Sequence, residues 1–308
     1  MLAAGAIALA WVLDARLGEP RSAWHPVAWF GRLAAPLGHA ARALPPHGAL
    51  WAGSLAWAGL VAMVIALAWG LQLLLARAPG WLALPLLALA LKPALSWRML
   101  RDEVAAVEAA LVRSLDEGRA QLARLCSRDV RALDEAGVRE TAIETLAENF
   151  NDSLVAPLFW FVVAGLPGAW AWRAANTLDA MWGYRDSWEW AGKCAARADD
   201  LLAWLPARLS VWLLWPACTD WRTLRREAVL TPSPNGGWPM AAMALRLGVR
   251  LGKPGVYTLN ATAPAPSAQA LARALATAGR AARRAFGLAL LAALLISLIH
   301  TALSGGSA

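Results

Sequence analysis

The sequence has little charge for its length. Asp, Glu, Lys and Arg make up 16% of its 308 residues, whereas hydrophobic residues make up 59%. A water-soluble domain carries about 25% charged residues, so this chain lacks the charge that a water-facing surface of its size needs. The abundance of apolar residues also excludes intrinsic disorder.

Cysteine is scarce as well. The three cysteines, Cys126, Cys194 and Cys218, exclude a disulfide-stapled secreted module and lack the spacing of metal ligands, so we expect inert thiols. Common nucleotide-binding and hydrolase motifs are absent, among them G-x-x-x-x-G-K-[ST], G-x-G-x-x-G, H-E-x-x-H and G-x-S-x-G. No run of Lys and Arg is interleaved with aromatic residues, and we therefore expect no nucleic-acid partner.

Tryptophan, in contrast, is abundant: 19 residues against five Phe and two Tyr. Tryptophan favours the boundary between membrane and water. Because long apolar runs accompany it and nothing alternates as a strand, we predict an all-α, multi-pass integral membrane protein with amphipathic cytoplasmic helices.

We treat residues 1–308 as a single membrane-embedded domain. The expected membrane segments are 49–76, 81–95, 154–172, 201–218 and 285–303. As a helix, the 28 residues of segment 49–76 reach about 42 Å, more than the roughly 30 Å hydrocarbon core, so this helix must tilt or extend past the interface. The run Met1–Leu13 is too short to cross and is expected to be a buried or interfacial helix.

The distribution of positive charge indicates topology. The formal net charge is +8, and 22 of the 29 basic residues lie in the polar stretches 14–48, 96–153 and 219–284. The positive-inside rule places these stretches in the cytoplasm. The shorter polar stretch 173–200 has only four basic residues, which by counting alone would place it outside.

An acidic stripe precedes the third apolar segment. It consists of Glu140, Glu144, Glu148 and Asp152, which recur every four residues and so lie along one side of a helix. Like charges at this spacing are destabilising unless cations or a metal offset them. One interpretation is a solvated face paired with arginines, namely Arg128, Arg131 and Arg139. The other is a Mg²⁺ site at the membrane boundary beside Asn149, because this hard cation prefers oxygen ligands.

A second polar group follows the same apolar segment. Arg173, Asn176 and Asp179 are spaced at i, i+3 and i+6, which places them on one helical face. An arginine, an amide and a carboxylate on one face can clamp a polar ligand, or they can pair with one another. Both interpretations stay open from the spacing.

Charged residues also surround the fourth apolar segment. Arg197, Asp199 and Asp200 lead into it, and Arg208 lies within it. A charge at membrane depth costs several kcal/mol and is usually paired or functional. Asp200 is two helical turns from Arg208, so we expect Arg208 to have another partner. Near the N-terminus, His25 belongs to a polar turn, where a structural role is the simpler interpretation.

These groups fall within five ordered motifs. The motifs are Asp14–Val27, Ala142–Trp160, Arg173–Tyr184, Ala196–Arg208 and Ser233–Pro239. Together they resemble the adenosylcobinamide-phosphate synthase family of cobalamin biosynthesis. The chain departs from the family pattern at Glu19, Ser127, Val130 and Ala203, where the family usually has Asp, Gly, Thr and Asn.

The resemblance implies an enzyme of the inner membrane with its active site facing the cytoplasm. Such an enzyme joins a carboxylate of adenosylcobyric acid to the amine of aminopropanol or its phosphate, using ATP and Mg²⁺, and yields adenosylcobinamide or its phosphate. Carboxylate and amine do not condense in neutral water, so we expect activation as an acyl phosphate. We also expect contact with membrane lipid and association with other membrane enzymes of cobalamin assembly.

This chemistry, applied to the motif positions, suggests a role for each candidate residue. The catalytic candidates are Glu144, Glu148, Asp179 and His25. The substrate-binding candidates are Asn149, Asn176, Arg173, Arg128, Arg197 and Arg208, since arginine suits bidentate contact with phosphate. The candidate metal ligands are Glu148, Asp152, Asp199 and Asp200. We expect all of these groups to converge in one water-accessible cleft.

That convergence requires stretches 142–153 and 173–200 to share one side of the membrane. A single crossing by 154–172 would separate them. This segment contains Pro157, Gly165, Pro167 and Gly168, which are poor residues for a helix interior, so we predict that it is broken or re-entrant. Two other functions stay open: a small-molecule transporter or channel, and a non-catalytic membrane sensor similar to the AmpE-type proteins.

Overall fold

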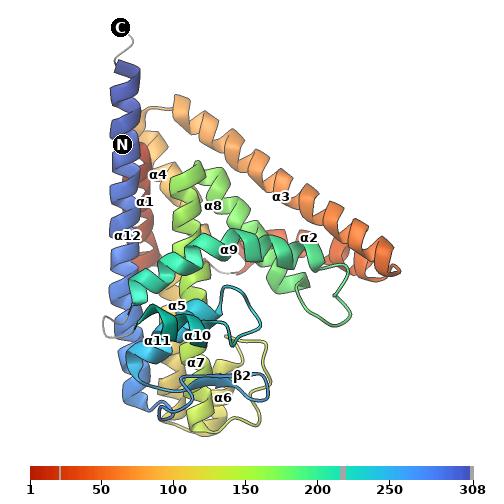
Figure 1. Cartoon of the computed structure of the whole chain (residues 1–308). Helices are drawn as coiled ribbons and strands as arrows, with labels where there is room; N and C mark the ends of the chain where they lie inside the picture. Colours follow the sequence, from red (N-terminus) through yellow and green to blue (C-terminus); the bar gives the residue numbers. More distant parts are fainter. Residues whose placement is uncertain (21, 216–219, 306–308) are drawn as a thin grey trace. The chain divides into compact units, whose positions relative to one another are not determined.

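The computed structural model of the chain describes residues 1–20, 22–215 and 220–305, and it confirms the all-α class. Helices dominate this part of the chain (Figure 1). Strands β1 (Leu251–Lys253) and β2 (Tyr257–Leu259) form a short antiparallel hairpin. We expected no strand, because three residues are too few to show an alternating pattern.

The chain divides into two compact units, each built from segments that are separated in the sequence. Unit 1 comprises Met1–Ser96, Ala156–Leu202 and Phe286–Ala308. Unit 2 comprises Trp97–Val155 and Ala203–Ala285. Each unit has its own packed interior and is described by itself.

Within the described residues, four helical stretches are long and apolar enough to cross a membrane. They are Pro46–Arg77, Gly80–Leu111, Glu135–Trp182 and Ala268–Leu303. Large apolar side chains on the first of them, such as Leu67 and Trp69, are exposed, which suits contact with lipid rather than water. These helices indicate a membrane protein.

The apolar segments of the sequence fall on helices throughout. Segment 49–76 lies in α3 (Pro46–Arg77), and segment 81–95 spans α4 (Gly80–Leu91) and the turn η2 (Lys92–Ala94). Segment 154–172 lies mostly in α8 (Ala156–Trp182). Segment 201–218 overlaps α9 (Lys193–Leu214), and segment 285–303 lies in α12 (Ala268–Gly305). The last three residues of segment 201–218 are outside the described residues. Which of these segments cross the membrane stays a prediction.

Unit 1 is a helical assembly in which α3 packs against α8. The remaining elements are α1 (Leu2–Leu17), η1 (Ser22–Trp24), α2 (Pro26–Arg42), α4 and η2, together with the parts of α9 and α12 assigned to this unit. The core includes Leu60, Leu178 and Trp182, all at most 5% exposed. At Gly53 a Cβ atom would lie 2.0 Å from the Ala191 carbonyl oxygen, so only glycine permits this close approach.

Helix α8 is interrupted inside the segment for which a break was predicted. Ala164 (φ −135°, ψ 16°) and Gly165 (φ 67°, ψ −154°) leave the helical region, and the two halves of α8 run in different directions in Figure 1. The amide of Leu166 donates a hydrogen bond to Gln72 Oε1 of α3 at 2.7 Å. This side chain replaces the acceptor that a continuous helix would supply. A re-entrant course for the segment stays a prediction.

Unit 2 is built around α7 (Glu135–Phe150). The helix begins at Asp134, whose side chain accepts a hydrogen bond from the Gly137 amide at 2.8 Å. It ends in a π-helical turn, η3 (Asn151–Val155). The other elements are α5 (Trp97–Leu111), α6 (Leu115–Leu122), the second half of α9 from Ala203, α10 (Trp221–Ala228), α11 (Gly237–Leu247), the β1–β2 hairpin and the first part of α12.

Candidate functional site

Unit 2 contains a cavity whose walls have both signs of charge. Its volume is about 270 Å³, and it lies among α7, the loop before α11 and the β1–β2 hairpin. The lining residues are Cys126, Ser127, Arg128, Thr141, Glu144, Thr145, Glu148, Thr231, Pro232, Ser233, Met240, Lys253, Val256 and Tyr257. Convergent hydroxyl, carboxylate and cationic groups in a concave site are typical of ligand-binding pockets.

The ion pair between Arg128 and Glu144 forms one wall of this cavity. Arg128 Nη2 lies 2.9 Å from Glu144 Oε2, and its Nη1 donates to the Thr141 hydroxyl at 2.7 Å. Glu144 is only 3% exposed, its carboxylate also interacts with the Tyr257 hydroxyl, and its second oxygen, Oε1, makes no other hydrogen bond. A carboxylate oxygen has two lone pairs, so Oε1 can accept a further proton donor that enters the cavity.

Glu148 lies one helical turn further along α7 and faces the loop before α11. A Cβ atom on Gly236 would lie 2.7 Å from Glu148 Oε1, so glycine leaves room for the carboxylate beside the loop. The loop is shaped by Ser233, whose Oγ accepts hydrogen bonds from the amides of Asn235 and Gly236 at 3.2 and 3.0 Å. The Ser233–Pro239 motif therefore lies directly against Glu148 of the acidic stripe.

Two cavity residues, Lys253 and Tyr257, were not among our candidates. They are paired across the hairpin, which brings both to the cavity. Burial raises the pKa of the Tyr257 phenol, and the nearby Glu144 carboxylate raises it further. Tyr257 therefore stays protonated at neutral pH and can donate a hydrogen bond. Between the two strands the sequence has Pro254 and Gly255, residue types that favour a turn.

The acidic stripe is not a solvated face, because Glu140 and Glu144 are 7% and 3% exposed. The expected pairing with Arg128 is confirmed for Glu144, whereas Glu140 pairs with Arg250 at 2.9 Å. The other two arginines that we considered have different partners. Arg131 pairs with Asp129, and Arg139 pairs with Glu108 and Glu135.

Asn149 and Asp152 lie near the end of the stripe. The Asn149 amide donates to the Thr145 carbonyl of its own helix at 3.1 Å. Asp152, in the turn η3, accepts a hydrogen bond from Asn151 Nδ2 at 2.8 Å, and Asn151 Oδ1 accepts one from Ser210 at 3.1 Å. These bonds tie the π-helical turn to α9 within unit 2.

Arg208 has the separate partner that we expected. Its guanidinium lies 4.9 Å from the Trp204 ring and 4.8 Å from the Trp238 ring, and it donates to Asn235 Oδ1 and the Pro234 carbonyl. Arg208 therefore holds the loop that approaches Glu148. Its predicted role in binding phosphate stays a prediction.

In unit 1, the second polar group joins α8 to α9. Asn176 Nδ2 donates to Asp199 Oδ1 at 3.2 Å. Arg173 Nε and Nη2 donate to the Ala94 carbonyl at 3.2 and 2.5 Å. Arg173 and Asn176 thus contact other elements. The hydrogen bond between Asn176 and Asp199 brings a candidate substrate-binding residue next to a candidate metal ligand.

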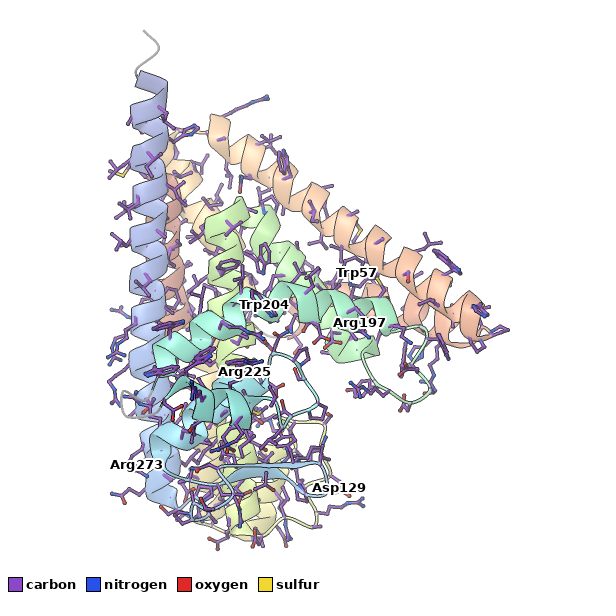
Figure 2. The ribbon with its side chains drawn as sticks, in the orientation of Figure 1. Trp57, Asp129, Arg197, Trp204, Arg225 and Arg273 are labelled. Atoms are coloured by element: carbon purple, nitrogen blue, oxygen red, sulfur yellow. The ribbon has the colours of Figure 1, made fainter. Side chains whose placement is uncertain are left out.

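Asp179 and Asp200 lie on the same two helices. A Cβ atom on Gly183 would lie 2.0 Å from Asp179 Oδ1, so glycine again permits a carboxylate to lie against the backbone. Burial raises the pKa of Asp200, while Arg197 and Arg185 lower it by their charge. Arg197 is exposed on α9 and is labelled in Figure 2.

His25 belongs to a buried charged cluster at the start of α2. Its Nδ1 accepts the Val27 amide at 3.2 Å and thereby caps α2, and its Nε2 lies 2.8 Å from Glu19 Oε2. Lys92 joins the cluster, with Nζ 2.6 Å from Glu19 Oε1 and 3.5 Å from Asp14 Oδ1. Both ring nitrogens of His25 are engaged, so its catalytic role stays a prediction.

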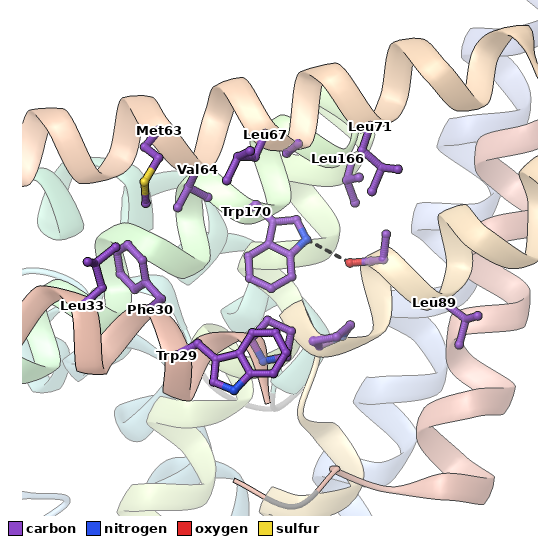
Figure 3. Close-up of a pocket in the computed structure, with 14 residues that line it drawn as sticks. Trp29, Phe30, Leu33, Met63, Val64, Leu67, Leu71, Leu89, Leu166 and Trp170 are labelled. Carbon is purple, nitrogen blue, oxygen red and sulfur yellow. Dashed lines mark hydrogen bonds between the residues drawn. The ribbon is translucent and has the colours of Figure 1, made fainter. Parts of the chain in front are cut away.

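Unit 1 also has an apolar cavity of about 450 Å³ among α2, α3, α4 and α8 (Figure 3). Its walls include Trp29, Leu67 and Trp170, and the indole of Trp170 donates to the Ala90 carbonyl at 2.9 Å. Its lining has no charged side chain, so it offers no group for acid–base chemistry or phosphate binding.

Within the described residues, no three His, Cys, Asp or Glu side chains are grouped closely enough to hold a metal on their own. Mg²⁺ commonly takes one or two protein carboxylates and completes its shell with water and substrate phosphates. Glu148 fits that requirement, because it is one of our candidate metal ligands and lines the unit 2 cavity.

The predicted residues divide between the two units. Unit 2 contains Arg128, Glu144, Glu148, Asn149, Asp152 and Arg208, and unit 1 contains His25, Arg173, Asn176, Asp179, Arg197, Asp199 and Asp200. The structure brings Arg128, Glu144 and Glu148 to one cavity. Convergence of all candidates in a single cleft stays a prediction.

Comparison with known proteins gives a match over nearly the whole chain. The family model described as "CobD/Cbib protein" matches residues 7–295. The "Cobalamin biosynthesis protein CobD" of Chromobacterium violaceum is 40% identical, over 95% of this chain and 97% of its own length. The "Probable cobalamin biosynthesis protein CobD" of Pyrococcus abyssi is 43% identical, over 82% of this chain and 83% of its own. No solved structure gives a significant match.

Proposed function

The chain belongs to the CobD/Cbib family, and from that premise we propose that it is a cobalamin-biosynthesis enzyme that forms an amide bond in an ATP-dependent reaction. The proposed acid is adenosylcobyric acid, and the proposed amine is aminopropanol or its phosphate. Relatives named for cobalamin biosynthesis support the pathway and hence a corrinoid substrate. The sequence motifs support the reaction.

The observation that carries the proposal is the unit 2 cavity, in which Arg128 and Lys253 lie with Glu144 and Glu148. A carboxylate must be activated before an amine attacks it. Transfer of the γ-phosphoryl group of ATP to a carboxylate oxygen gives an acyl phosphate and ADP. Attack of the amine nitrogen on the acyl carbon then forms the C–N bond, releases phosphate and requires a base to take a proton.

We assign the phosphate contacts to the two cations of the cavity. The ion pair with Glu144 and the bond to Thr141 fix the orientation of Arg128, which suits it to bind phosphate oxygens. Lys253 adds a second positive charge from the hairpin. Both cations would offset the charge that develops during phosphoryl transfer.

The carboxylates take the remaining roles. Glu148, with Asp152 nearby on the chain, would hold Mg²⁺, which would supply positive charge to offset that of the transferred phosphoryl group. The buried Glu144 carboxylate, beside the Tyr257 hydroxyl, would accept the proton of the incoming ammonium. In unit 1 we assign substrate orientation to Asn176 and Asp179, phosphate contact to Arg173 and Arg197, and further metal contacts to Asp199 and Asp200.

An activity assay tests the proposal. Purified chain is incubated with ATP, adenosylcobyric acid and aminopropanol phosphate, and ADP and the corrinoid amide are measured by mass spectrometry. We expect the amide with equimolar ADP, and a loss of at least about 100-fold in kcat for Glu148→Gln. The control Glu117→Gln changes an exposed residue of the same unit and should retain activity. Transport of the substrate without formation of the amide would indicate a transporter. The absence of both transport and amide would indicate a sensor. Either outcome would refute the proposed ligase activity.

We also propose that the protein lies in the inner membrane and that its site faces the cytoplasm, because ATP and the corrinoid are found in the cytoplasm. Residues Arg131 and Asp186 are exposed in units 2 and 1. In a variant with serine at the native cysteines, Arg131→Cys and Asp186→Cys should both resist an impermeant thiol reagent in intact cells. Both should react in inverted vesicles. If the reagent labelled the two positions from opposite sides of the membrane, the proposal that both lie on the cytoplasmic side would be refuted.

A further inference from the structure

The second half of α9, which belongs to unit 2, has an exposed apolar face. Trp204, Leu205, Leu209 and Trp212 are 52%, 51%, 42% and 69% exposed. Their spacing places them on one side of the helix. On the opposite side, Ala203 and Leu214 are buried, at 2% and 0% exposed. A contiguous apolar surface of this kind is rare in contact with water and indicates an interaction site.

A column of tryptophans extends this face from α9 to α10. The ring centroids of Trp212 and Trp215 are 5.8 Å apart, those of Trp215 and Trp221 are 5.9 Å apart, and those of Trp221 and Trp238 are 5.1 Å apart. The interplanar angles are 22° and 14° for the first two pairs, which are stacked, and 32° for Trp221 and Trp238, which are tilted. Stacking holds Trp212 and Trp221 in fixed positions, although they are 69% and 43% exposed.

Arginines flank the aromatic column. Arg208 lies between the Trp204 and Trp238 rings, and α10 has the exposed arginines Arg222, Arg225 and Arg226. Trp204 and Arg225 are labelled in Figure 2. The acids nearest along the chain are engaged by the backbone. Asp220 accepts the Thr223 amide at 2.9 Å, and Glu227 accepts the Asn260 amide at 2.7 Å, while its Oε1 lies 3.9 Å from Arg226 Nε.

We propose that this tryptophan–arginine face, formed by residues 204–215 and α10, lies in the headgroup region of an anionic phospholipid bilayer. Tryptophan and arginine are the side chains that suit this region, the first for its amphipathic ring and the second for its charge. α9 is not among the four stretches that are apolar enough to cross a membrane. An amphipathic helix with an apolar outer face instead lies along the membrane surface.

Depth-dependent quenching tests the position of this face. The full-length chain, with serine at its three native cysteines, receives an environment-sensitive fluorophore at Leu209→Cys and is reconstituted in nanodiscs. We expect a nitroxide on the lipid headgroup to quench this label about threefold more than the same label at Arg131→Cys, an exposed site elsewhere in unit 2. Equal quenching at the two sites would overturn the proposal. A label shielded from both water and nitroxide would indicate a second copy or another protein, which also overturns it.

Charge variants test the preference for anionic lipid. Adding phosphatidylglycerol to phosphatidylcholine nanodiscs should increase quenching at position 209. The triple variant Arg222→Gln, Arg225→Gln, Arg226→Gln should lose that increase. The matched control Arg113→Gln, Arg124→Gln, Arg131→Gln removes three exposed arginines elsewhere in unit 2 and should keep it. Equal behaviour of the two triple variants, both with wild-type circular dichroism, would refute the role of α10.

Discussion

Gln72 Oε1 accepts a hydrogen bond from the amide of Leu166 at 2.7 Å, and this bond links α3 to the break in α8. Gln72 is one of two polar residues in an otherwise apolar stretch of α3, the other being Ser54. In an apolar environment, a backbone amide needs an acceptor from protein. The glutamine therefore lies where the interrupted helix requires a hydrogen-bond partner.

Gln72→Leu should destabilise the protein, because it leaves the Leu166 amide without an acceptor. We expect a loss of about 1–3 kcal/mol in the free energy of unfolding. Thermal unfolding in detergent, followed by circular dichroism, measures the effect. Ser54→Ala removes a polar group from the same helix about 27 Å away and should be nearly neutral. Equal midpoints for the two variants would count against the capping role.

Gly165→Ala should also destabilise the protein. Gly165 has φ 67°, and a Cβ atom there would lie 2.3 Å from Gln72 Oε1. We expect backbone strain of about 1–3 kcal/mol in addition to this clash. On α3, a Cβ atom at Gly59 would contact nothing within 4 Å, so Gly59→Ala should instead stabilise by up to about 1 kcal/mol. Measurement of the melting temperatures checks this prediction: Gly165→Ala should lower the melting temperature and Gly59→Ala should raise it.

Arg128→Gln should cost about 3 kcal/mol, because it leaves the buried Glu144 without its ion-pair partner. The side chains of Arg128 and Glu144 are 14% and 3% exposed. The double variant Arg128→Gln, Glu144→Gln should therefore lose less stability than the sum of the single variants. Chemical unfolding of all four proteins gives the coupling energy. Strict additivity would show that the pair contributes no interaction energy.

Glu19 predicts a pH dependence of stability. Burial raises the pKa of Glu19, but hydrogen bonds and charge from His25 and Lys92 outweigh burial and hold it below its usual value of 4.5. A carboxyl group whose pKa is lower in the folded protein than in the unfolded chain stabilises the fold when the pH is above the pKa of the unfolded chain. This stabilisation is lost as the pH falls through the pKa of the folded protein. Wild type should therefore lose melting temperature more steeply than Glu19→Gln below pH 4.5. Parallel pH profiles would contradict the assignment.

Several features of the fold could be predicted from local sequence. The scarcity of charge indicated a membrane protein, and the glycines and prolines around Gly165 indicated the break in α8. The family resemblance was confirmed over residues 7–295. In these cases the physical cause lies within a short segment, where composition and backbone preference act directly.

Other features depend on residues that are distant in the sequence. Lys92 ends an apolar helix, and nothing near it predicts an ion pair with Glu19, 73 residues earlier. The cavity residue Tyr257 is brought to α7 by a hairpin whose strands are three residues long, too short for a periodic signal. Spacing identified the acidic stripe, but not which arginine pairs with which acid.

The interleaving of the two units affects how the chain is made. Helix α12 completes unit 2 up to Ala285 and supplies unit 1 from Phe286 onward. During synthesis, therefore, neither unit has all of the segments described here until α12 has left the ribosome. A nascent chain stalled before α12 would present two incomplete interiors at once, so neither unit can complete its packing before α12 has been made.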